Sequence, residues 1–145
     1  MTRLLDINVL LALAWEVHPH HDDAHSWVAA QTKSGPLHVA TCPLTELGFL
    51  RISMQMSGVM ADLPSARAAL MSLRNQPEFK HHFWPDSIAP SAAFVTSRSP
   101  GRIGPKDLTD IYLAELAVEK KGVLATFDTK INHPEIELIH SSATS

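Results

Sequence analysis

A lone carboxylate at the junction between a short apolar run and a helical pattern constrains this chain more than any other feature. Asp6 closes a predicted strand around residues 4–7, and apolar residues then recur at helical spacing through Val17. We take Asn8 as the N-cap of this helix. Ligands of open parallel α/β sheets bind at the carboxyl ends of the strands, so Asp6 should face such a crevice. There it needs a cation, a metal ion or hydrogen-bond donors as a partner.

Helical patterns and apolar runs alternate along the rest of the chain. Helices are expected near residues 9–17, 21–30, 43–56, 64–75 and 107–121, and further strands near 37–40, 83–84, 123–127 and 136–139. Residues 85–106 are expected to be irregular, apart from a short helix near 91–95. Alternation of this kind predicts an α/β fold of three layers, α/β/α, with a central parallel sheet of four to five strands.

The length and composition limit the class of protein. A chain of 145 residues predicts one domain, here residues 1–140 followed by a polar tail at 141–145. The single Cys42 excludes an intramolecular disulfide and a four-cysteine zinc site, and it suits a reducing cytoplasm. Because we find neither a membrane-spanning run nor a signal-peptide pattern, we expect a cytoplasmic protein without a membrane partner. The net charge of −3 decides little, since a nucleic-acid binder needs only a local basic stripe.

Two further acids occupy positions like that of Asp6, and a third can join them from the start of a helix. Glu46 follows the second predicted strand, Asp128 follows the strand at 123–127, and Asp110 lies in the first turn of the helix after residue 107. In a parallel sheet these side chains converge at one edge, where they repel one another unless a divalent cation is bound. Carboxylate oxygens suit Mg²⁺ or Mn²⁺. The pattern therefore points to metal-assisted hydrolysis of phosphodiester bonds.

Four segments in order resemble the acidic motifs of the PIN domain and, more narrowly, of the VapC toxins of bacterial toxin–antitoxin pairs. They are LDINVL at 5–10, PLTELGFLR at 43–51, LTDIYLA at 108–114 and LATFD at 124–128. The resemblance covers nearly the whole chain. It implies a PIN-like fold and a magnesium-dependent endoribonuclease, with Mn²⁺ as a substitute, that is the toxin of a type II pair. It also implies a homodimer, and a VapB-type antitoxin whose tail enters the acidic groove and inhibits cleavage.

The resemblance assigns roles to individual residues. Asp6 and Asp110 hold the metal directly, Asp128 acts through water, and Glu46 holds or orients the attacking water. The polar residues that steady these acids by hydrogen bonds are expected to be Asn8 and Thr126. Four basic residues are expected to contact RNA or its phosphates, namely Arg51, which is also placed to pair with an acid, and Arg98, Arg102 and Lys106.

Simpler interpretations stand beside these. Asp107 and Asp110 are close neighbours, and we assign a capping role to Asp107. Glu46 is also consistent with a favourable interaction with a helix dipole. The cluster from His18 to His25 suggests a zinc site, but without a completing ligand a solvated loop and helix start is favoured.

Two other functions are considered. A catalytically silent module that binds RNA or the antitoxin would share the same fold and groove. A phosphohydrolase with Asp6 as a covalent nucleophile would need a second Asp two residues later, where the chain has Asn8.

Overall fold

The computed structural model describes residues 1–94 and 99–140 and contains one parallel sheet of five strands. The strand order is β3-β2-β1-β4-β5. Their bounds are β1 Arg3–Leu5, β2 Leu37–Thr41, β3 Phe79–Phe83, β4 Val123–Thr126 and β5 Ile136–Leu138. All neighbouring strands pair in parallel, and β1 lies at the centre between β2 and β4. The predicted three-layer α/β/α architecture is confirmed.

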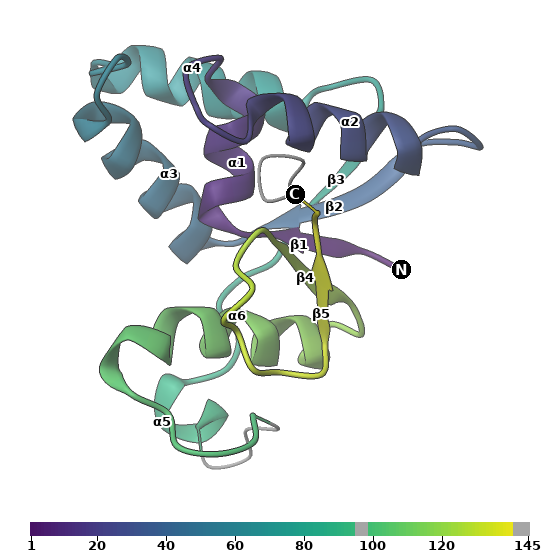
Figure 1. Cartoon of the computed structure of the whole chain (residues 1–145), viewed down its shortest axis with the longest axis vertical. Coiled ribbons are helices and arrows are strands. Elements are labelled where there is room, and N and C mark those ends of the chain that lie inside the picture. Colours follow the sequence, from purple (N-terminus) through teal and green to yellow (C-terminus); the bar gives the residue numbers. More distant parts are fainter. Residues whose placement is uncertain (95–98, 141–145) are drawn as a thin grey trace.

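Helices cover both faces of the sheet. One layer contains α1 (Ile7–Ala14), α2 (His21–Gln31), α3 (Pro43–Gln55) and α4 (Leu63–Arg74). The other contains α5 (Pro90–Ala93) and α6 (Leu108–Glu119), with a 3₁₀ turn, η1 (Pro105–Asp107), before α6. Figure 1 shows the sheet between these two layers. None of the helices in the described residues is long and apolar enough to cross a membrane.

Each face of the sheet has its own apolar core because successive strand residues point to opposite sides. Leu5 and Ala125 pack with the layer of α1 to α4, whereas Leu4 and Leu124 pack with α6. Leu4 and Leu5 are at most 1% exposed. Burial on both faces explains why the central strands β1 and β4 lack polar alternation in the sequence.

Two features lie at other positions than the sequence predicted. The N-cap of α1 is Asp6, because its carboxylate accepts a hydrogen bond from the backbone N–H of Ile7, so the expectation for Asn8 is wrong. The third strand begins at Phe79, earlier than the aromatic pair at 83–84 suggested, because its backbone pairs with the whole of β2. The polar tail at 141–145 lies outside the described residues.

Gly122, between α6 and β4, has no room for a side chain. Left-handed backbone is found at Lys121, with φ of 60°. A Cβ on Gly122 would lie 2.5 Å from the carbonyl oxygen of Thr2 and 2.8 Å from Cη2 of Trp84. We predict that Gly122→Ala lowers the free energy of unfolding by about 1–3 kcal/mol through overpacking, measured by urea denaturation. Lys121→Gly is the control and should change it by less than about 1 kcal/mol. Equal stability of Gly122→Ala and the unsubstituted protein would contradict this explanation.

Candidate active site

Asp6 is a buried carboxylate fixed at the point where β1 becomes α1. It is 5% exposed. Its Oδ1 accepts a hydrogen bond of 2.8 Å from the backbone N–H of Ile7, and its Oδ2 accepts one of 2.7 Å from the hydroxyl of Thr126. Burial raises the pKa of Asp6, the two hydrogen bonds lower it, and the nearby charge of Asp128 raises it further. The side chain is therefore held in one orientation beside a second acid.

Thr126, the last residue of β4, connects two of the predicted acids. Its hydroxyl donates to Asp6 and accepts a hydrogen bond of 3.0 Å from the backbone N–H of Asp128. The carboxylate of Asp128 in turn accepts a hydrogen bond of 2.8 Å from the backbone N–H of Lys130. These bonds fix the turn after β4 relative to the start of α1.

Asp110 completes the group of acids from the first turn of α6. Its pKa is raised to about 7, first by burial and then by the charges of Asp6, Asp128 and Asp107. The carboxylate of Asp107 accepts a hydrogen bond of 2.9 Å from the backbone N–H of Gly104 and so stabilises the turn that precedes α6. The charges of Asp6 and Asp128 thus act on Asp110, although the three residues are far apart in the sequence. We call Asp6, Asp110 and Asp128 the acidic cluster.

Glu46 is held differently from the acidic cluster. Its Oε2 accepts a hydrogen bond of 2.6 Å from the hydroxyl of Thr41 and is 3.4 Å from Nη1 of Arg74. The charge of Glu46 is not among those that raise the pKa of Asp6 or Asp110. Sequence reasoning missed Thr41 and Arg74, because nothing in the pattern of α4 indicates that its last residue reaches the start of α3.

A cleft of about 490 Å³ opens beside the acidic cluster. Two acids of the cluster, Asp110 and Asp128, line it, together with a third acid, Asp107. The other charged and polar residues in its walls include Arg102, Lys106, Lys130 and Asn132. Lys130 was not expected from the sequence, since single exposed lysines carry no pattern. Asp6, in contrast, is almost fully buried.

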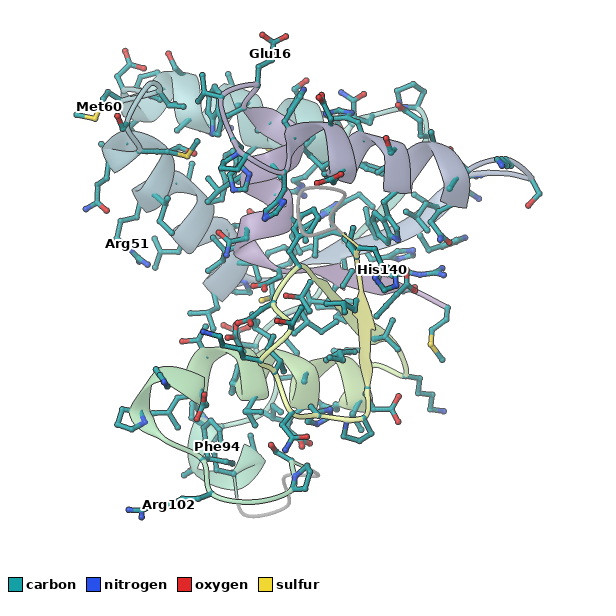
Figure 2. All side chains as sticks on the ribbon, viewed as in Figure 1. Glu16, Arg51, Met60, Phe94, Arg102 and His140 are labelled. Carbon is teal, nitrogen blue, oxygen red and sulfur yellow. The ribbon has the colours of Figure 1, made fainter. Side chains whose placement is uncertain are left out.

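The other predicted residues lie in different places. Arg51 is exposed on α3, and no ion pair joins it to another of the described residues. Figure 2 shows Arg51 on the layer opposite Arg102. Asn8 is exposed, and its side chain makes no hydrogen bond to the acids among residues 1–94 and 99–140. Arg98 lies outside the described residues.

Two histidines of α2 contact the C-terminal end of α1. Ring nitrogens of His21 and His25 lie 2.7 and 2.9 Å from the carbonyl oxygens of Ala12 and Leu13. A carbonyl can only accept, so both rings donate to the last turn of α1. This contact explains the i, i+4 spacing of the two histidines without zinc.

The acidic cluster fits a divalent cation in the kind of donor it offers. Its carboxylates are hard oxygen donors that lie close enough for their charges to interact. Mg²⁺ and Mn²⁺ prefer oxygen donors of this kind. Within the part of the chain that the structure describes, no three His, Cys, Asp or Glu side chains are already grouped closely enough to hold a metal ion between them. The fit therefore rests on donor chemistry and charge.

Comparison with known proteins agrees with this geometry. A parallel α/β/α domain with acids at the carboxyl ends of β1 and β4 is PIN-like. A solved structure of VapBC2 from Rickettsia felis, bound to a DNA fragment from their promoter, shares the fold with a TM-score of 0.64 and 14% sequence identity. That match covers 95% of this chain and 97% of the other. No family model matches the sequence.

Curated relatives give the family. Ribonuclease VapC29 of Mycobacterium tuberculosis is 38% identical over 133 residues, covering 92% of this chain and 90% of the relative. Ribonuclease VapC39 of the same organism is 37% identical over 136 residues, covering 90% and 91%. Ribonuclease VapC38 is 35% identical over 130 residues, covering 88% and 86%. The chain belongs to the VapC ribonuclease family.

The hydroxyl of Thr126 yields a stability prediction. Thr126 is 0% exposed, so Thr126→Val would leave Asp6 buried with one donor fewer. We expect the free energy of unfolding to fall by about 1–3 kcal/mol, measured by chemical denaturation at neutral pH. Thr126→Ser keeps the hydroxyl and serves as the control. A valine variant as stable as the serine variant would show that the hydrogen bond contributes little.

His81 on β3 predicts a pH dependence of stability. Burial, the charge of Arg74 and His82 lower its pKa from 6.5 to about 4. Between pH 6.5 and 4 the unfolded chain therefore binds a proton that the folded chain does not, and this costs stability as the pH falls. Denaturation at several pH values should show a shallower loss over this window for His81→Gln. The control is His82→Gln on the same strand, and equal slopes for the two variants would contradict the prediction.

Proposed function

We propose that this VapC family member is the toxin of a type II toxin–antitoxin system and a metal-dependent endoribonuclease that hydrolyses RNA phosphodiester bonds. The observation that carries the proposal is the acidic cluster beside an open cleft, in which the charge of Asp128 contributes to the raised pKa of Asp6, and the charges of Asp6 and Asp128 contribute to that of Asp110. The ribonuclease relatives support the reaction type.

Asp6 and Asp110 would hold a divalent cation directly, and Asp128 would act through water. Mg²⁺ is the proposed ion, with Mn²⁺ as a substitute, because both prefer carboxylate and water oxygens. A bound divalent cation lowers the pKa of its water and stabilises charge on phosphate oxygens. Thr126 keeps Asp6 in place by its hydrogen bond. Glu46, from the start of α3, holds or orients the attacking water.

RNA binding is assigned to the basic residues at the cleft. Arg102, Lys106 and Lys130 line it together with the acids, so they can hold phosphates that the acids alone would repel. Arg51 lies on the opposite layer, where it can contact RNA that extends past the cleft (Figure 2). Sequence specificity would come from this rim and from the shape of the RNA.

The proposed partners follow from the family. The VapBC2 complex of Rickettsia felis supports a VapB-type antitoxin as the partner of this chain. We propose that the antitoxin inhibits cleavage by entering the acidic groove, that the toxin is a homodimer, and that it acts in the cytoplasm.

Substituting the acids tests the proposed reaction. Asp6→Asn and Asp110→Asn remove charge from the cluster, so RNA cleavage in Mg²⁺ should fall by about a hundredfold or more. Rates on total RNA, measured for purified and folded protein, provide the readout. Asp22→Asn on α2 is the matched control, because Asp22 is an exposed acid.

Unchanged rates in folded Asp6→Asn would contradict the catalytic role of the cluster. A folded wild-type protein that cuts no RNA in Mg²⁺ or Mn²⁺ would favour the catalytically silent binding module.

The basic residues can be tested separately by salt dependence. Arg102→Ala and Lys106→Ala should each raise the KM for RNA and reduce the slope of log binding constant against log salt by about one unit. Binding of a labelled RNA to the catalytically impaired Asp6→Asn background provides the measurement. Lys33→Ala in the loop before β2 is the control. Identical slopes for all variants would show that RNA follows another surface.

A further inference from the structure

A chain of hydrogen bonds runs from β3 through β2 to Glu46. Nε2 of His81 lies 2.7 Å from the hydroxyl oxygen of Thr41, and that oxygen lies 2.6 Å from Oε2 of Glu46. Thr41 is 1% exposed, and Glu46 has a largely covered side chain. The three groups therefore form one continuous polar path.

The direction of each hydrogen bond follows from the atoms involved. An ionised carboxylate has no proton, so the single hydroxyl proton of Thr41 must point to Glu46. The hydroxyl oxygen is then an acceptor, and His81 must carry its proton on Nε2. A neutral imidazole with this tautomer satisfies the path. Partial burial and the charges of Arg74 and His82, which lower the pKa of His81 to about 4, favour the neutral ring.

The path fixes one oxygen of Glu46 and leaves the other. Both Thr41 and Arg74 approach Oε2, at 2.6 and 3.4 Å. Within the described residues no donor contacts Oε1. The guanidinium of Arg74 also lies 6.0 Å from the ring centre of Phe83, which limits its movement. Glu46 is thus anchored on one side only.

We propose that Thr41 and His81 are positioning residues that orient Glu46 through this path, so that Oε1 faces the attacking water. The inference rests on the proposed function, in which Glu46 handles that water. His81 acts at a distance from the reaction, through Thr41. A neutral histidine suits this task because its Nε2–H determines which way the threonine hydroxyl points.

The adjacent histidine shows why His81 is singled out. Nε2 of His82 lies 3.0 Å from Nδ1 of exposed His38, and the two rings stack with centres 5.3 Å apart. Neighbouring residues of a strand point to opposite faces of the sheet. His82 therefore shares the strand, the residue type and part of the environment of His81, yet it does not contact Thr41.

Kinetics on paired variants test the proposal. Thr41→Val and His81→Leu remove a donor, and kcat for RNA cleavage should fall roughly tenfold or more while KM changes by less than about twofold. Thr41→Ser and His81→Gln keep a donor and should restore kcat to within about threefold of wild type. His82→Leu is the matched control and should leave kcat unchanged.

A double-variant comparison separates positioning from general destabilisation. If Thr41 acts through Glu46, Thr41→Val should lower kcat no further once Glu46→Gln is present, because effects of residues that act as a unit are not additive. Full additivity of the two losses would overturn the proposal. So would a wild-type kcat in folded Thr41→Val.

Nitrogen NMR of His81 supplies a readout that does not depend on activity. The wild-type protein at neutral pH should show a neutral ring with its proton on Nε2, and Thr41→Val should change that signal while the His82 signal stays constant. A proton on Nδ1 would overturn the path. Wild-type protein that cuts no RNA would overturn the proposed function and with it this role of Glu46. RNA cleavage that needs Asp6 but not Thr41 or His81 would overturn the inference alone.

Discussion

The hydrogen bond from Thr126 to Asp6 is the contact on which the arrangement of the site depends. It joins the end of β4 to the start of α1 across 120 residues of sequence, at 2.7 Å and with both groups buried. The backbone N–H of Ile7 supplies the second donor, so a carboxylate that burial alone would disfavour is held at a helix N-terminus. Once Asp6 is fixed there, the parallel pairing of β1 with β4 brings Asp128 beside it and α6 presents Asp110.

The acids of the site divide into two electrostatic environments. The charge of Asp128 adds to the raised pKa of both Asp6 and Asp110, and the charge of Asp6 adds to that of Asp110, so positive charge is favoured at the cluster. Glu46 instead has Arg74 and the hydroxyl of Thr41 as partners. Carboxylates in different environments can take different roles in one reaction. This division is the physical basis for assigning cation binding to the cluster and water orientation to Glu46.

The sequence predicted most of the fold because β1, β2 and β4 are largely apolar runs and the helices have clear start and stop signals. It misplaced β3, whose residues 80–82 are Lys and His. The end of the first strand singled out Asp6, since ligands of parallel sheets bind at that edge. The resemblance to the PIN motifs singled out Thr126, and its hydroxyl does donate to Asp6. The sequence misplaced the N-cap at Asn8, because Asp and Asn are both good caps and spacing alone does not choose between them. It missed Arg74 and His81, whose contacts depend on how α4 and β3 pack against α3 and β2, a tertiary relation without a local signal. Lys130 was missed for the same reason.

The central claim is that the acidic cluster binds a divalent cation, and calorimetric titration of Mn²⁺ into the folded protein tests it most directly. At neutral pH the account predicts saturable binding to wild-type protein that is lost or strongly weakened in Asp6→Asn. Heats no larger than those of dilution, or a wild-type isotherm retained in the variant, would contradict the claim that these carboxylates form the metal site.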